Sequence, residues 1–113
     1  MSIVTGSASA MEADYTTLCR ADELEPGEAR AFEVNGRSVA LFSTDEGFFA
    51  TDLLCTHGQA SLAEGFVEGT VVECPLHAGS FCLRTGTALS APAQVPLRTY
   101  PVSVTDGIVA VKA

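Results

Sequence analysis

Two short motifs, each pairing a cysteine with a histidine, constrain this chain more than any other feature. The first runs Cys55-Thr56-His57 and the second Cys74-Pro75-Leu76-His77, with sixteen residues between His57 and Cys74. The chain contains two histidines in all, and both fall in these motifs. Thiolate and imidazole ligands together suit zinc, copper or an iron–sulfur cluster. We therefore expect the two motifs to lie on loops that meet, so that all four side chains converge on one metal centre.

The same four ligands are compatible with centres of different chemistry. In an iron–sulfur centre with two cysteines and two histidines, the cysteines hold one iron and the histidines the other, and the centre exchanges one electron. A zinc ion with this ligand set is structural only. Disulfides are a third alternative, because the cysteines, at positions 19, 55, 74 and 82, are even in number. With no secretion signal, reduced or metal-bound thiols are favoured over disulfides.

Length and composition exclude several other classes of protein. A chain of 113 residues is expected to form one domain. The net charge of −8 argues against nucleic-acid binding, which needs clustered Lys and Arg. With 47% apolar and 18% charged residues, the chain is too apolar to be disordered. It has no apolar run of about 18–20 residues and no signal-like segment in its first ten, so we expect a cytoplasmic protein without membrane contact.

The remaining pattern consists of short strands separated by turn signals. Asn35-Gly36 between two alternating runs is a strong hairpin signal, and Asp45-Glu46-Gly47 and Asp106-Gly107 mark further turns. Strands are expected at 31–34, 37–42, 48–51, 69–73, 80–84, 100–104 and 108–111, with short helical pieces at 21–24 and 60–63. This spacing favours an all-β antiparallel sandwich or small barrel. The small, polar segment 1–13 is interpreted as a flexible tail, and 14–113 as the domain.

The two motifs and their surroundings resemble the Rieske family, and within it the small Rieske ferredoxins of bacterial aromatic-ring dioxygenase systems. The resemblance extends from about Tyr15 to the C-terminus and is carried by Cys55–Gly58, Glu64–Gly69, Glu73–His77, Phe81 and Arg84–Gly86. It implies a Rieske-type antiparallel β sandwich with a small cluster-binding subdomain at about 51–81.

The resemblance also implies one [2Fe–2S] cluster and a role for each ligand. Cys55 and Cys74 would hold the buried iron, and His57 and His77 the outer iron. The histidine edge would then be the port through which the electron enters and leaves. The loop 91–96, Ala-Pro-Ala-Gln-Val-Pro, is similar to a third loop that covers the cluster; an ordinary rigid connection between strands is the alternative.

The function implied is that of an electron carrier rather than an enzyme. The protein would pass single electrons from an NAD(P)H-dependent flavoprotein ferredoxin reductase to a terminal Rieske non-haem iron oxygenase, and would bind no organic substrate itself. Two other functions remain open. One is a small Rieske subunit of a reductase complex of the nitrite reductase type, and the other is a zinc-stapled interaction module.

Departures from the respiratory Rieske proteins predict a low reduction potential. Those proteins carry a disulfide across the two cluster loops, where Ala60 and Leu76 stand here. They also carry a serine and a tyrosine hydroxyl that donate to the cluster or a ligand sulfur, where Gly79 and Phe81 stand here. Because such donors stabilise the more negative reduced state, we expect a potential near about −150 mV.

Other side chains are assigned to surface or core. Residues 52–83 hold four acids (Asp52, Glu64, Glu68 and Glu73) and no Lys or Arg, so this part of the surface is expected to steer docking onto basic partners. Cys19 and Cys82 match no ligand position and are expected to be buried as small apolar residues. The phenyl rings of Phe48, Phe49, Phe66 and Phe81 are expected in the core or as shielding of the cluster.

Overall fold

The structure is a computed structural model, and it describes residues 15–55, 60–75, 79–90 and 95–113. Over these residues the chain forms short strands joined by tight turns and two single-turn 3-10 helices. The strands are β1 (Thr16–Arg20), β2 (Ala29–Val34), β3 (Arg37–Thr44), β4 (Gly47–Asp52), β5 (Phe66–Glu68), β6 (Val71–Glu73), β7 (Ser80–Cys82), β8 (Ala88–Ser90), β9 (Thr99–Tyr100), β10 (Val102–Thr105) and β11 (Ile108–Val111). The helices are η2 (Ala21–Glu23) and η3 (Leu62–Glu64).

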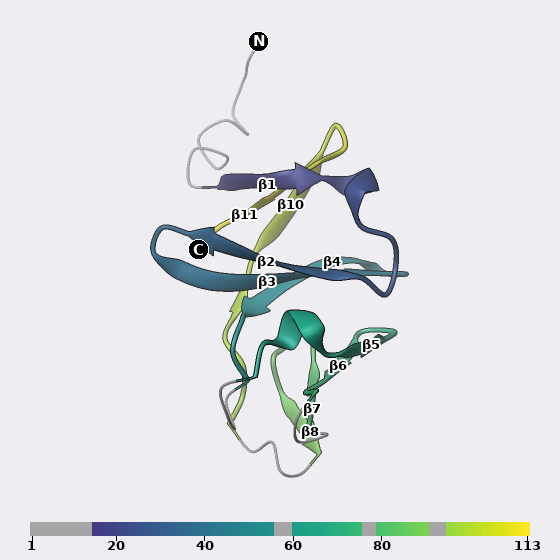
Figure 1. Cartoon of the computed structure of the whole chain (residues 1–113). Coiled ribbons are helices and arrows are strands. Elements are labelled where there is room, and N and C mark those ends of the chain that lie inside the picture. Colours follow the sequence, from purple (N-terminus) through teal and green to yellow (C-terminus); the bar gives the residue numbers. More distant parts are fainter. Residues whose placement is uncertain (1–14, 56–59, 76–78, 91–94) are drawn as a thin grey trace.

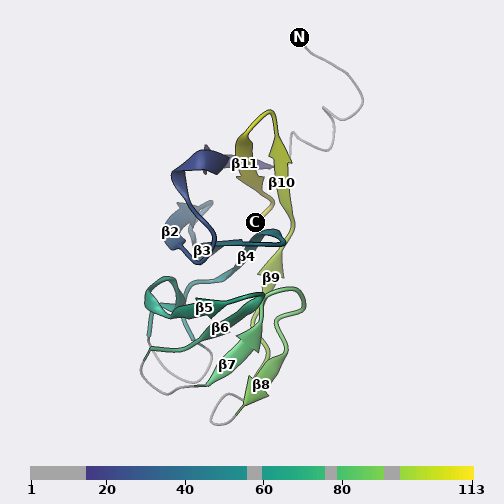
Figure 2. The same cartoon turned by 90° about the vertical axis from the view of Figure 1, so that its right-hand side faces the viewer.

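Three antiparallel sheets are stacked along the long axis of the molecule (Figure 1). Their strand orders are β1-β11-β10, β2-β3-β4-β9 and β5-β6-β7-β8. The sheet of β2, β3, β4 and β9 lies between the other two in both views (Figures 1 and 2). The all-β antiparallel prediction is confirmed, and no described helix is long and apolar enough to cross a membrane.

Two of the predicted turns have the backbone geometry that hairpins favour. Asn35 and Gly36, between β2 and β3, have φ of 51° and 82°. Asp106 and Gly107, between β10 and β11, have φ of 52° and 77°. Two consecutive residues with positive φ make a type I′ turn, whose twist matches that of the strands it joins. These turns set the register of both hairpins.

Strand β3 is buried on both faces and separates two cores. Its residues Ala40 and Phe42 pack into a core with the third sheet, while Val39 and Leu41 pack into a core with the first. All four are fully buried. Because successive side chains of a strand point to opposite faces, one continuous apolar run supplies both cores.

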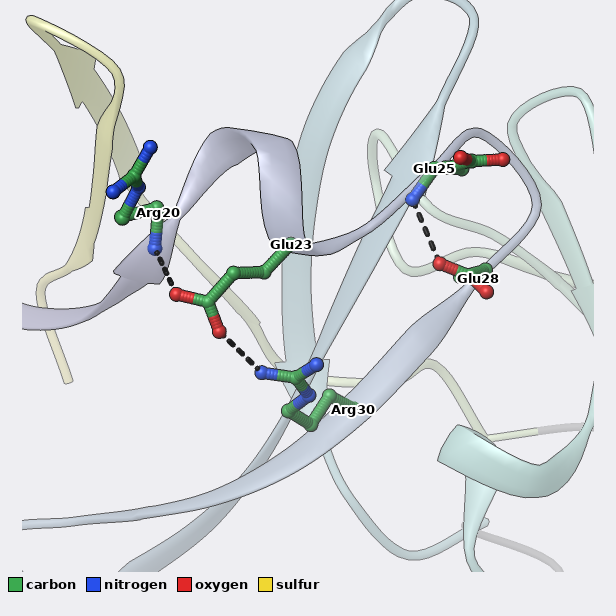
Figure 3. A network of polar contacts seen from close by, with 5 residues as sticks. All are labelled: Arg20, Glu23, Glu25, Glu28 and Arg30. Carbon is green, nitrogen blue, oxygen red and sulfur yellow. Dashed lines mark hydrogen bonds and ion pairs between the residues drawn. The ribbon is translucent and has the colours of Figure 1, made fainter.

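A carboxylate holds η2 at the junction of β1 and β2 (Figure 3). The Glu23 carboxylate accepts a hydrogen bond from the Arg20 backbone N–H and another from the Arg30 guanidinium, both at 3.0 Å. These contacts lower the pKa of Glu23, the Arg20 N–H having the larger effect.

Two sequence expectations about side chains are wrong. Phe66 is 66% exposed, since it stands in the edge strand β5 on the face turned away from the core. Cys82 is half-buried rather than buried, because it follows the fully buried Phe81 in β7 and so points to the opposite face. Phe81 and Cys19 are buried as expected, and Phe48 and Phe49 pack against the two cores. The second helical piece begins at Leu62 rather than residue 60.

Candidate metal centre

Cys55 and Cys74 begin two loops that close in the same way. The Cys55 N–H donates to the carbonyl oxygen of Ala60 at 2.9 Å, and the Cys74 N–H donates to that of Gly79 at 2.7 Å. In each case the acceptor lies five residues after the cysteine. Both predicted motifs therefore fall within loops of equal size, each starting from a cysteine.

The two cysteines lie in one apolar core. Cys55 is 4% exposed and Cys74 1% exposed, and both belong to the core that contains Leu62, Val72 and Phe81. None of the four cysteines of the chain forms a disulfide. The structure thus brings together the two predicted thiol ligands in surroundings that exclude water from the sulfur side.

Antiparallel pairing positions each cysteine. The loop of Cys55 leaves the end of β4, where the Leu53 N–H donates to Ser38 at 3.0 Å and the Leu62 N–H donates to Leu53 at 2.8 Å. The loop of Cys74 leaves the end of β6, whose last residue, Glu73, pairs with Ser80 of β7. Both cysteines therefore follow directly from hydrogen-bonded ladders.

Gly65 allows η3 to approach β6 closely, a role that the sequence did not reveal. A Cβ at Gly65 would lie 2.3 Å from the backbone oxygen of Glu73, closer than any side chain tolerates. Glu73 directly precedes Cys74. This close approach lets η3, which includes Leu62, pack against β6, the strand that leads directly into the second cysteine.

The predicted histidine ligands lie outside the described residues. His57 is within 56–59 and His77 within 76–78, and the covering loop at 91–94 is likewise not described. Of the predicted ligands, the structure therefore places Cys55 and Cys74, and the roles of His57 and His77 stay predictions.

Comparison with known sequences decides the family. The model of the Rieske [2Fe-2S] domain matches residues 14–101, most of the chain. The chain belongs to the Rieske [2Fe-2S] domain family. Two cysteines buried in one apolar core are the thiolate half of what such a cluster needs, so the described residues fit the group.

Within this family, the chain is similar to ferredoxin components of dioxygenase systems and to a nitrite reductase small subunit. The chain is 54% identical to the 3-phenylpropionate/cinnamic acid dioxygenase ferredoxin subunit of Photorhabdus laumondii, over 80% of this chain and 86% of the relative. A solved complex of reduced oxygenase and oxidized ferredoxin in carbazole 1,9a-dioxygenase contains a similar chain, at TM-score 0.82 and 39% identity, covering 87% of this chain and 92% of that one. A nitrite reductase small subunit from Mycobacterium tuberculosis, described there as putative, is similar at TM-score 0.78 and 30% identity, covering 86% and 92%.

Proposed function

We infer that this Rieske protein is the one-electron carrier of an aromatic-ring dioxygenase system. It takes electrons from an NAD(P)H-dependent flavoprotein reductase and passes them to a terminal oxygenase, and it is not itself an enzyme. The observation that carries this inference is the 54% identity to a dioxygenase ferredoxin subunit over 86% of that subunit's length. Because the reductant of such a system is a cytoplasmic nucleotide, we place the protein in the cytoplasm.

We propose that Cys55 and Cys74 hold one iron of the cluster and that His57 and His77 hold the other. Burial of both cysteines in one core supports the first assignment. The second rests on sequence, since each histidine follows its cysteine within a loop that the cysteine begins. A [2Fe–2S] cluster, when bound, supplies one reversible electron step.

The chain's own residues would keep that step separate from water on the cysteine side. Leu62, Val72 and Phe81 are fully buried around the two thiols. The hydrogen bonds from the Cys55 and Cys74 N–H groups fix the start of each loop. This rigidity suits a carrier, because an electron centre held by a packed core reorganises little between its two charge states.

A small subunit of a nitrite reductase complex is the second candidate. It is favoured by the likeness to the putative nitrite reductase small subunit, which extends over 92% of that chain. The identity of 30% is well below the 54% to a dioxygenase ferredoxin, so we rank it second. The match to a [2Fe-2S] domain likewise favours iron and sulfide over a zinc-stapled module.

Reconstitution tests the carrier role. The protein is purified anaerobically and added to the reductase and terminal oxygenase of a 3-phenylpropionate dioxygenase system that lacks its ferredoxin. We expect NADH-dependent dihydroxylation only when this protein is present. Failure of the cluster-loaded protein to restore dihydroxylation would reject the dioxygenase role. If this protein instead supported nitrite reduction by a nitrite reductase large subunit, the second candidate would be established.

The ligand set is tested separately by iron, sulfide and electron paramagnetic resonance. Cys55→Ser and His77→Ala are expected to lose the cluster signal. Cys82→Ser is the matched control, because Cys82 is half-buried on the other face of β7, and it should keep iron and sulfide at wild-type levels. A colourless wild-type protein that contains zinc would overturn the whole assignment.

A further inference from the structure

The sheet of β5 to β8 has one buried face and one open face. Val67, Val72 and Phe81, aligned across three strands, point into the core. The neighbouring row is formed by Phe66, Glu73, Ser80 and Ser90, which pair in register across all four strands. Since adjacent rows point to opposite sides of a sheet, this second row lies on the outer face. Figure 2 shows the four strands side by side, at the end of the molecule away from β10 and β11.

The outer face is hollowed and carries an exposed ring. The hollow is lined by Phe66, Glu68, Val71, Glu73, Ser80 and Ser90. Phe66 is 66% exposed, unusual for a phenylalanine in a protein whose other described phenylalanines are buried or half-buried. A large exposed ring in a concave surface marks a contact site more often than an isolated surface residue does.

The charges of this hollow are of one sign. Glu73 stands opposite the ring in register, and Glu68 lies two residues along the same strand and on the same face. No Lys or Arg occurs between positions 52 and 83 to neutralise them. A ring flanked by carboxylates fits a guanidinium, which stacks on the aromatic face while donating paired hydrogen bonds to a carboxylate.

We propose that the outer face of β5–β8 is a docking surface for an arginine-bearing patch of the terminal oxygenase, an assignment that rests on the proposed function. The hollow adjoins the cluster site, because Glu73 directly precedes Cys74. A partner seated there is therefore held beside the electron centre. The oxygenase is chosen over the reductase because a similar ferredoxin is found in a solved complex with its oxygenase.

The experiment measures kcat/KM of the oxygenase for this ferredoxin with Glu68→Gln and Phe66→Leu, using 3-phenylpropionate dioxygenase components. Glu73 is left unchanged, because it adjoins a proposed ligand. Each variant is expected to lower kcat/KM by about two- to fivefold at low salt, the effect of one exposed ion pair or cation–π contact. The Glu68→Gln loss should disappear at about 1 M salt, where the screening length is about 3 Å.

Matched controls lie on other sheets and turns. Glu25→Gln removes an exposed carboxylate beside β2, and Val104→Ala trims a 49% exposed side chain on β10. Both are expected to keep wild-type kcat/KM. The rate of cluster reduction by the reductase, followed by visible absorbance, should stay within twofold of wild type in every variant.

The outcomes separate this surface from the carrier role. Wild-type kcat/KM in both Phe66→Leu and Glu68→Gln would overturn the docking surface and leave the carrier role intact. Slower reduction by the reductase with unchanged oxygenase turnover would also overturn it, because the hollow would then belong to the other partner. Loss of turnover in the wild-type protein itself would reject the carrier role, and the docking surface with it.

Discussion

The hydroxyl of Tyr100 in β9 donates a hydrogen bond to the carboxylate of Asp52 at the end of β4. Asp52 stands three residues before Cys55, so the bond joins the core of the first two sheets to the segment that leads into the first cysteine–histidine motif. The backbone N–H of Asp52 also donates a hydrogen bond to the carbonyl oxygen of Arg98 at 3.0 Å. The two hydrogen bonds therefore connect the end of β4 to the segment around β9, which is distant from it in sequence.

Tyr100→Phe is expected to destabilise the protein while keeping its shape. The ring stays in the core, but the bond to a charged acceptor is lost, at a cost of about 1–2 kcal/mol. For a chain of this size that corresponds to a fall in Tm of roughly 5–10 °C. Thermal unfolding of the cluster-loaded protein measures it, and an unchanged Tm would show that the bond contributes nothing to stability.

The contribution of Tyr100 to the stability of the protein is expected to be lost in alkali. Burial, followed by the hydrogen bond to Asp52, raises the pKa of Tyr100 above its ordinary value of 10.0. A raised pKa contributes stability that is complete below pH 10 and is lost as pH rises through the folded-state value. The Tm difference between wild type and Tyr100→Phe, measured by thermal unfolding, should therefore shrink as pH rises above 10.

Gly86 and Gly36 have similar backbone angles but differ in the space around their Cα atoms, so substituting each by alanine separates the cost of a steric clash from the cost of a left-handed backbone. Gly86 has φ of +80° and Gly36 has φ of +82°. A Cβ at Gly86 would lie 2.1 Å from the Leu97 backbone oxygen, whereas at Gly36 nothing lies within 4 Å. Gly36→Ala is expected to cost about 1–2 kcal/mol for the left-handed backbone alone. Gly86→Ala should cost about 2 kcal/mol more, since backbone must move. Equal losses of Tm would contradict the close approach.

Glu23 is expected to stabilise the protein at neutral pH but not in acid. Hydrogen bonds from the Arg20 N–H and the Arg30 guanidinium lower the pKa of Glu23 from 4.5. A lowered pKa contributes stability that is present above the unfolded-state value and is lost as pH falls through the folded-state value. Glu23→Gln should therefore lower Tm at pH 7, and the difference should close below pH 4.5. Glu25→Gln is the control, since Glu25 joins the network of Figure 3 through its backbone N–H.

The two cysteines outside the proposed ligand set should differ in reactivity. The Thr85 side-chain hydrogen bond is the main cause that lowers the pKa of half-buried Cys82, while burial is the main cause that raises the pKa of Cys19. Since the thiolate is the nucleophile, Cys82 should be alkylated by iodoacetamide faster than Cys19 by about an order of magnitude at pH 8. Peptide mass spectrometry of the loaded protein measures both rates, and preferential labelling of Cys19 would refute the assignment.

The sequence predicted those parts of the fold that local chemistry determines. Asn35-Gly36 specifies its hairpin because few other residues adopt two positive φ angles in succession. Strand β8, of three residues, was not predicted, because it carries little local signal and depends on pairing with β7. The outward position of Phe66 was missed for a related reason: a strand of three residues does not show which face is buried. The alternation of side chains along one strand, by contrast, could have shown that Cys82 points away from the core that buries Phe81.

Some features of the candidate site could likewise be predicted from the sequence, and others could not. The cysteine–histidine spacing predicts the four ligands as a set, and the structure places two of them, Cys55 and Cys74, in one core. The equal closure of the two loops on Ala60 and Gly79 was not foreseeable, because backbone hydrogen bonds leave no trace in residue identity. Nor was the fit of Gly65 against Glu73, which depends on how η3 and β6 pack.

The absence of side-chain donors at Gly79 and Phe81 predicts a low reduction potential. Phe81 is fully buried in the core that holds both proposed cysteine ligands, and it has no hydroxyl to stabilise added negative charge. Redox titration of the loaded protein should give a midpoint near about −150 mV. Phe81→Tyr adds a hydroxyl donor to this core and should raise the midpoint, while Phe48→Tyr, in the other core, should leave it unchanged. A clearly positive wild-type midpoint, or equal midpoints in all three proteins, would show that these donors do not set the potential here.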